Sequence, residues 1–278
     1  MIRKFKLKNE YGAEYDLNDK SHFLIKPDGL GFSLEKSYTR ISSTWVNNFL
    51  RDSQNEIRGE IIFTSNSPYK ELKKFLKYAF SSEKLTMVYI TDAGEYLRDV
   101  DLTELDKSEM DNGVLSCPVT FTAKSLWYQS VINRIIIDLT TADIVRYPYR
   151  FPSRFADYSG GEAELFNDSS IPAPFTVLFE GPVINPTITI TKGSEILKVR
   201  IKADASRGDA IRYSSIDGDL YCELIKENGE VKNLVSGLDI NNENFFKIPC
   251  GASNLRVESD SGIESPITVN VYKMYRAV

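Results

Sequence analysis

The sequence predicts a mainly β protein of the α+β class, in which a strand-rich N-terminal domain with one helix precedes an antiparallel β-sandwich. The first observation is a pair of runs with strictly alternating side chains, Thr187–Thr191 and Leu197–Ile201, separated by a short turn. A period of two is typical of strands with one buried and one solvated face. The second observation is a single stretch with a helical period, residues 68–80. The third is the frequent proline and glycine between Tyr147 and Pro186, which excludes long helices there.

The predicted helix begins after Ser67. Serine is a residue type that caps helices, and Pro68 suits the first helical position because proline lacks the N–H that has no intrahelical partner there. An apolar stripe at helical spacing is expected to lie against a sheet. The stripe consists of Leu72, Phe75, Leu76, Ala79 and Phe80. The rest of the helix surface carries Lys70, Lys73, Lys74 and Lys77.

Three segments around this helix have strand character because apolar residues alternate along them. The alternating residues are Leu30, Phe32 and Leu34 in the first segment, Ile57, Ile61 and Phe63 in the second, and Leu115, Cys117, Val119, Phe121 and Ala123 in the third. Several strands with a single helix, and no regular strand–helix alternation, indicate an α+β domain rather than a parallel sheet.

The C-terminal half contains strand and turn signals alone. Phe175–Phe179 fits a short strand between prolines, and Asp217-Gly218 and Asn228-Gly229 are hairpin-type turns. Alternation returns near the end in Ile267–Val271. These signals favour an antiparallel β-sandwich. We therefore expect two domains, residues 1–128 and residues 129–278.

Composition and charge argue against several classes of protein. The chain of 278 residues carries 34 Lys and Arg against 39 Asp and Glu, scattered along its length, for a formal net charge of −5. This balance argues against a nucleic-acid partner and against an anionic membrane surface. No stretch approaches the roughly 20 apolar residues of a membrane-spanning helix, and no apolar stretch follows the basic start as in a signal peptide. Three widely spaced cysteines, Cys117, Cys222 and Cys250, predict free thiols and folding in a reducing cytoplasm.

No pattern of catalytic or metal-binding residues stands out. His22 is the only histidine and lies next to turn residues, so we expect a solvated turn residue, and the scattered cysteines do not complete a zinc site with it. Asp99 and Asp101 share a face of an expected strand, an arrangement that a glycoside hydrolase could use and that chance also produces. No cofactor is expected, because Gly160-Gly161 does not extend into a phosphate-binding pattern.

Aromatic residues are the remaining candidates for a binding site. Trp127-Tyr128 and the cluster from Tyr147 to Phe155 could stack on sugars or anchor a partner, and they could equally pack in a core or between domains. Trp45 differs because it lies in the polar context of Ser42–Asn48, where a core tryptophan is less expected. Trp45 is therefore a candidate interface residue.

The order of these features resembles the distal tail proteins of long-tailed, non-contractile (siphovirus-type) bacteriophages. The likeness includes the N-terminal domain with one amphipathic helix, the passage Phe121–Tyr128 that closes this domain, and Asn185–Ile190, which opens the later sandwich strands. Near the end, Ile248–Gly251 and Asn254–Val257 look like the family's proline-glycine turn and its following strand, with Cys250 inserted between proline and glycine.

The resemblance implies a structural protein and not an enzyme. In the family the N-terminal domain forms a homohexameric ring that joins the tail tube to the tail tip or baseplate, and a galectin-like sandwich projects from the ring. The implied partners are further copies of the chain, a tail tube protein, a tail tip or tail-associated protein and a receptor-binding protein. The implied location is the distal end of the tail in the virion, after synthesis in the host bacterial cytoplasm.

The resemblance also implies that the segment from Trp45 to Arg58 is a protruding hairpin that reaches a neighbouring subunit, although its polar composition is also that of a plain loop. The residues expected at partner contacts are Trp45, Asn48, Arg51, Tyr147 and Tyr149. Two other functions stay open. One is a carbohydrate-binding module that recognises host cell-wall or surface glycans through the aromatics from Tyr147 to Phe155, and the other is a glycoside hydrolase that uses Asp99 and Asp101.

Overall fold

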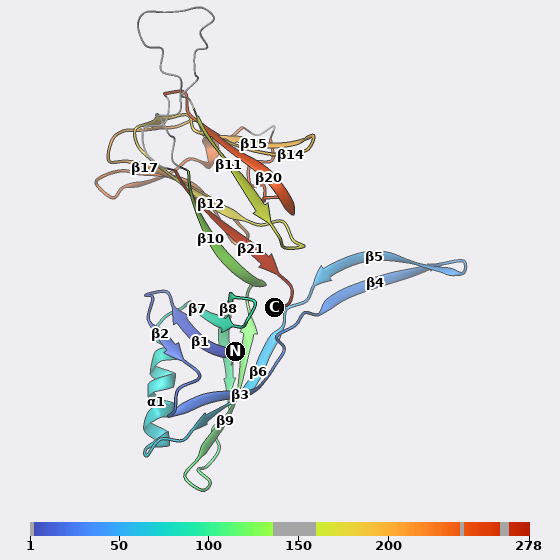
Figure 1. The fold of residues 1–278 in the computed structure, drawn as a ribbon, viewed down its shortest axis with the longest axis vertical. Coiled ribbons are helices and arrows are strands. Elements are labelled where there is room, and N and C mark those ends of the chain that lie inside the picture. Colours follow the sequence, from blue (N-terminus) through green and yellow to red (C-terminus); the bar gives the residue numbers. More distant parts are fainter. Residues whose placement is uncertain (1–2, 136–159, 240–241, 262–266) are drawn as a thin grey trace, which may run out of the picture. The chain divides into compact units, whose positions relative to one another are not determined.

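The computed structural model describes residues 3–135, 160–239, 242–261 and 267–278, and it divides into two compact units (Figure 1). The first unit is Met1–Gln129 with Tyr275–Val278, and the second is Ser130–Met274. The chain passes from the first unit to the second within β10 (Trp127–Ile135) and returns within β21 (Ile267–Tyr275). Within the described ranges the fold is mainly β with antiparallel pairing and one α-helix, which confirms the predicted fold class.

A seven-stranded antiparallel sheet with the order β3-β6-β9-β8-β7-β1-β2 forms the body of the first unit. The strands are β1 (Lys4–Asn9), β2 (Glu14–Asp16), β3 (His22–Asp28), β6 (Glu56–Phe63), β7 (Leu85–Ile90), β8 (Glu95–Leu105) and β9 (Leu115–Ala123). The sheet curls, because a bridge between Asn18 and Phe23 and a 2.8 Å hydrogen bond from the Leu24 N–H to the Leu17 carbonyl join its two ends.

The buried face of this sheet follows the alternation in the sequence. On β6 the side chains of Ile57, Ile61 and Phe63 are buried, and on β9 every second residue from Leu115 to Ala123 is buried. Helix α1 (Pro68–Ala79) adds Leu72, Phe75 and Ala79 to the same core. The hydroxyl of Tyr78 fastens the helix to the sheet, since it lies 2.8 Å from the carbonyl oxygens of both Leu7 and Ala13.

Of four local expectations for the first unit, one is met in part and three are wrong. Ser67 occupies the N-cap position, but its side chain makes no capping hydrogen bond and its carbonyl accepts the N–H groups of the first turn instead. Phe80 lies past the helix end and is 71% exposed. Phe32 is 53% exposed and lies in a loop, because the chain turns at Gly29, whose φ is +78°. His22 is buried at 6% exposure in β3, where its ring nitrogens contact the Ser21 hydroxyl and the Asp16 carbonyl.

The second unit is a sandwich of two antiparallel sheets. The larger sheet has the order β19-β18-β17-β12-β21-β10 and the smaller one the order β11-β20-β14-β15. The remaining strands of these sheets are β11 (Gly160–Asn167), β12 (Phe175–Glu180), β14 (Thr187–Lys192), β15 (Glu195–Arg200), β17 (Ala210–Ile216), β18 (Asp219–Ile225), β19 (Val231–Asn233) and β20 (Gly251–Glu258). A short ladder pairs β13 (Val183–Ile184) with β16 (Asp204–Ala205), and η1 (Val235–Gly237) is a single 3₁₀ turn.

One apolar core lies between these two sheets. The smaller sheet contributes Ile188, Ile190 and Val257 among others, and the larger contributes Phe175 and Val269, all buried. The predicted turns at Asp217-Gly218 and Asn228-Gly229 connect β17 to β18 and β18 to β19, and both glycines have a positive φ. The predicted sandwich is therefore confirmed as an architecture of two packed sheets.

Candidate functional site

A two-stranded hairpin leaves the sheet of the first unit between β3 and β6. It consists of β4 (Leu34–Ile41) and β5 (Thr44–Asp52), which pair with each other and with no other described strand. Figure 1 shows the hairpin extending away from the rest of that unit. All nine residues of β5 are exposed, so neither face of the hairpin is packed within the chain as described.

The hairpin exposes six large apolar side chains. The exposed apolar side chains are Tyr38, Ile41, Trp45, Val46, Phe49 and Leu50, and Trp45 is 65% exposed. Contiguous apolar surface on a soluble protein marks an interaction site or an aggregation hazard. The outer edges of β4 and β5 pair with no other described strand, and such free strand edges can pair with another chain.

A bulge on β5 decides which side chains share a face. The register shifts between Ser37 and Tyr38, so that Asn48 is the extra residue on β5. Residues directly opposite each other in an antiparallel pair lie on one face, and successive residues alternate. What we call the tryptophan face comprises Leu34, Lys36, Tyr38, Arg40, Trp45, Asn47, Leu50 and Asp52. The hydroxyl face comprises Glu35, Ser37, Thr39, Ile41, Thr44, Val46, Phe49 and Arg51.

Two of the expected contact residues stiffen the hairpin itself. The amide of Asn48 donates to the hydroxyl of Thr39 at 2.8 Å and fixes the bulge. Arg51 donates to Glu35 at 2.5 Å, and its guanidinium lies 5.5 Å from the ring centroid of Phe49. This hydrogen bond lowers the pKa of Glu35 and raises that of Arg51. Asn48 and Arg51 therefore stabilise the conformation of the hairpin β4–β5, which we also call the arm. Within the residues that the structure describes, Trp45 makes no such contact and is exposed to a partner.

The base of the hairpin is fixed to the body of the first unit. Arg276 forms a two-pronged ion pair with Asp52, with N–O distances of 2.7 and 3.2 Å, and the Ser53 N–H donates to the Ser33 carbonyl at 2.9 Å. A polar hollow of about 360 Å³ lies beside this base. Its lining consists of Asp28, Ser33, Gln54, Asn55, Glu56, Arg58 and Thr122. The arm thus leaves the body from an anchored and strongly polar base.

The first unit contains a buried cation, Arg98. Arg98 is 2% exposed, donates to the Ser125 carbonyl at 2.9 Å and lies 5.3 Å from the ring of Trp127. Burial lowers the pKa of this guanidinium to about 10, and its Nη1 has no hydrogen-bond partner in the described part of the chain. Trp127 is fully buried and donates to the Leu30 carbonyl, so it is a core residue and not a sugar platform.

The carboxylate pair considered for hydrolysis has structural contacts. Asp99 accepts hydrogen bonds from the Thr86 and Tyr128 hydroxyls at 2.9 and 3.1 Å, and Asp101 pairs with Lys124 at 3.2 Å. Among the described residues, no group of three or more His, Cys, Asp or Glu side chains could hold a metal ion. In the same residues, no helix is long and apolar enough to cross a membrane. The three cysteines are free thiols.

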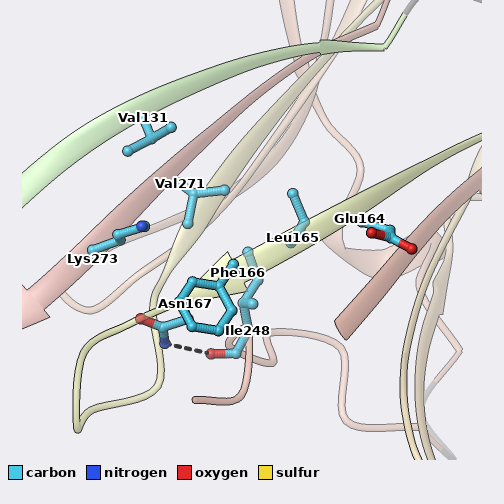
Figure 2. A pocket seen from close by; sticks show the side chains of 8 residues that line it. All are labelled: Val131, Glu164, Leu165, Phe166, Asn167, Ile248, Val271 and Lys273. Atoms are coloured by element: carbon cyan, nitrogen blue, oxygen red, sulfur yellow. Dashed lines mark hydrogen bonds between the residues drawn. The ribbon is translucent and has the colours of Figure 1, made fainter. Parts of the chain in front are cut away.

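The second unit carries two lesser surface features. The outer face of its smaller sheet is polar, with Arg256 between Glu162 at 3.5 Å and Glu258 at 2.7 Å, and Phe166 on the same face of β11 is 64% exposed. A pocket of about 70 Å³ lies at the β11 edge. Figure 2 shows its lining, which comprises Val131, Glu164, Leu165, Phe166, Asn167, Ile248, Val271 and Lys273.

The remaining expected contact residues, Tyr147 and Tyr149, lie outside the described residues. The structure therefore brings Trp45, Asn48 and Arg51 together on one hairpin and leaves the other two as sequence predictions. Sequence reasoning missed the apolar partners of Trp45 on this hairpin. Their spacing does not follow a period of two, because the bulge at Asn48 interrupts it.

Comparison with known proteins assigns the first unit. Residues 4–124 match the family model of the distal tail protein, N-terminal domain. Among curated proteins no significant match to the chain was found. The expected resemblance to this family is thereby confirmed over residues 4–124.

Solved structures with the same fold cover nearly the whole chain. A chain of the phage P2 baseplate in its activated conformation with Ca is 15% identical with a TM-score of 0.68, and one from the same baseplate with Sr is 14% identical with a TM-score of 0.67. In both cases 100% of each chain is covered. The SPP1 Dit (gp 19.1) protein, described as a paradigm of the hub adsorption apparatus in Gram-positive infecting phages, is 11% identical with a TM-score of 0.62, over 97% of this chain and 98% of that one.

Proposed function

We propose that this chain, whose residues 4–124 form a distal tail protein domain, is a homohexameric hub that joins the tail tube of a phage to its tail tip or baseplate. Residues 1–128 form the ring, and the sandwich of residues 129–278 carries docking surfaces for the host-adsorption apparatus. The partners are a tail tube protein, a tail tip or tail-associated protein and a receptor-binding protein. The location is the distal end of the tail in the virion.

The observation that carries this proposal is the hairpin β4–β5 of a distal tail protein domain. Six large apolar side chains on it are exposed, and no described part of the same chain covers them. A ring subunit needs surface that is unsatisfied in the monomer and complementary to a second copy. The hairpin supplies such surface with its bulge and base already fixed, so that little ordering accompanies association.

Light scattering and electron microscopy of the purified chain test the hub. We expect a particle with the mass of six chains and a ring with a central opening. A chain that stays monomeric at micromolar concentration, and is missing from the tail end of assembled particles, would refute the hub. Labelling of virions with an antibody against the sandwich locates the protein independently.

Glycan recognition by the sandwich is a second candidate, favoured by Phe166 on the polar face of the smaller sheet. An exposed aromatic ring on the same sheet face as carboxylate, amide and guanidinium groups offers the chemistry that binds sugar rings and hydroxyls. Phe166 and Ile196 are matched for a test, because both lie on edge strands of this sheet at 64% and 65% exposure. On a glycan array we expect Phe166→Ala to lose binding and Ile196→Ala to retain it. A wild-type chain that binds no glycan would eliminate this candidate.

A further inference from the structure

We infer that the tryptophan face of the hairpin in one copy docks on the loop between β8 and β9 of the next copy, which we call the acidic loop, residues 106–114. This inference rests on the proposed homo-oligomeric hub and identifies the surface that receives the arm. It is argued from charge, apolar exposure and position within the first unit.

The tryptophan face carries two cations that the chain does not neutralise. In the described part of the chain, Lys36 and Arg40 have no carboxylate within 4.0 Å, and the one hydrogen bond of Arg40 is to the Ser42 carbonyl at 3.0 Å. Both lie on the same face as Tyr38, Trp45 and Leu50. A partner for this face therefore has to provide negative charge together with apolar contact.

The acidic loop offers both. Asp106 and Asp111 have no cation within 4.0 Å among the described residues, whereas Glu109 is already engaged by the Tyr69 hydroxyl at 2.9 Å and by Lys107 at 3.7 Å. Met110 and Val114 in the same loop are 48% and 36% exposed. Two free carboxylates beside two exposed apolar side chains complement the two free cations and the aromatic rings of the arm.

The acidic loop is held in one conformation before any partner arrives. The Tyr69 hydroxyl accepts the Met110 N–H at 3.3 Å, and the backbones of Asp111 and Val114 exchange two hydrogen bonds of 2.9 Å. The Asp106 N–H donates to the Pro118 carbonyl at 2.9 Å. A preordered loop lowers the entropic cost of association.

The arm and the acidic loop lie at opposite ends of the first unit. The β6–β9 ladder runs from the pair Glu56 and Thr122, next to the base of the arm, to the pair Phe63 and Leu115, next to the acidic loop. At about 3.3 Å per residue this ladder is about 23 Å long, and β4, which has the same number of residues, reaches about as far. A contact between two different ends of identical chains is head-to-tail, which is the type of contact that closes rings.

Charge exchange in the full chain tests this contact, with light scattering and sedimentation as readouts. The arm variant is Lys36→Glu with Arg40→Glu, and the loop variant is Asp106→Lys with Asp111→Lys. Each variant alone places like charges opposite each other at the contact. We therefore expect the dissociation constant of each variant to be at least ten times that of the wild type. An equimolar mixture is expected to assemble again, because alternating copies restore opposite charges at every contact. Lys73→Glu with Lys77→Glu is the control for net charge, since both lysines are exposed on α1.

Each outcome decides the question. Restored assembly in the mixture, with an unaffected control, supports the contact. Variants that assemble like wild type, or a mixture that stays dissociated while both variants keep the circular dichroism spectrum of the wild type, overturn the contact and leave the hub intact. A wild-type chain that does not assemble at all overturns the hub and this contact together.

Discussion

Replacement of Trp45 by alanine tests whether this side chain contributes to association between chains and not to the stability of the folded monomer. Fully covering a tryptophan removes on the order of 230 Å² from water, and the 65% that is exposed here leaves about 150 Å² for a partner to cover. At about 25 cal/mol per Å² this surface is worth about 4 kcal/mol. Ordering the side chain costs about 1 kcal/mol, so about 3 kcal/mol remains, or about a hundredfold in the dissociation constant.

The same substitution is expected to leave the folded monomer nearly unchanged. Trp45 is on a hairpin with no packed face in the described chain, and such surface substitutions change the free energy of unfolding by about 0.5 kcal/mol or less. Trp127 is the matched control, because it is the other tryptophan of the chain and is fully buried. Trp127→Ala is expected to lower the free energy of unfolding by about 3–5 kcal/mol.

Two assays distinguish the two tryptophans. Sedimentation equilibrium gives the dissociation constant, and denaturant unfolding at a concentration below that constant gives the stability of the monomer. The reasoning predicts a large change in the first and a negligible change in the second for Trp45→Ala. Unchanged association, or a loss of stability that approaches that of Trp127→Ala, would show that Trp45 is not a docking residue.

Three further predictions concern particular contacts. Burial raises the pKa of the Tyr78 hydroxyl from 10.0 to about 12. The unfolded chain therefore loses the hydroxyl proton at lower pH than the folded chain, and the free energy of unfolding falls as pH rises between these values. In denaturant titrations, Tyr78→Phe should remove this pH dependence. Asn48→Ala removes the 2.8 Å bond that fixes the bulge, and we expect association, measured by light scattering, to weaken by about 3–10-fold with little change in thermal unfolding. Ile190→Ala should cost about 2–5 kcal/mol in chemical unfolding because Ile190 is buried, and Ile196→Ala should cost about 0.5 kcal/mol or less; equal losses would contradict the assigned faces of β14 and β15.

The regular part of the fold was predictable because burial imposes a period on the sequence. Ile57, Ile61 and Phe63 are an even number of residues apart, and apolar residues occupy every second position of β9, so their shared inward face follows from the spacing. The frequent proline and glycine between Tyr147 and Pro186 argued against long helices there for backbone reasons that do not depend on tertiary context, and the described part of that stretch, residues 160–186, contains no helix. The exposure of Trp45 was predictable for the opposite reason, because most of its neighbours in the sequence are polar. That it binds a partner stays a prediction.

The misses arise where tertiary contacts override a local pattern. Phe32 alternates with its neighbours, yet Gly29 passes so close to the Glu56 carbonyl that no side chain fits there, and the segment turns instead of continuing as a strand. His22 is polar and next to turn residues, but both ring nitrogens find partners, which makes its burial affordable in β3. No local signal predicts a buried Arg98, because its contacts with Ser125 and Trp127 come from residues 27 and 29 positions away.

The route of the chain has a consequence for how such proteins can be rebuilt. The polypeptide leaves the first unit after Gln129 and resumes it at Tyr275, and the side chains of these two residues are 3.1 Å apart in a hydrogen bond. The sandwich is thus inserted into the first unit between two residues that lie next to each other. A short linker in its place would leave a continuous first unit, and another module with neighbouring ends could be exchanged for it.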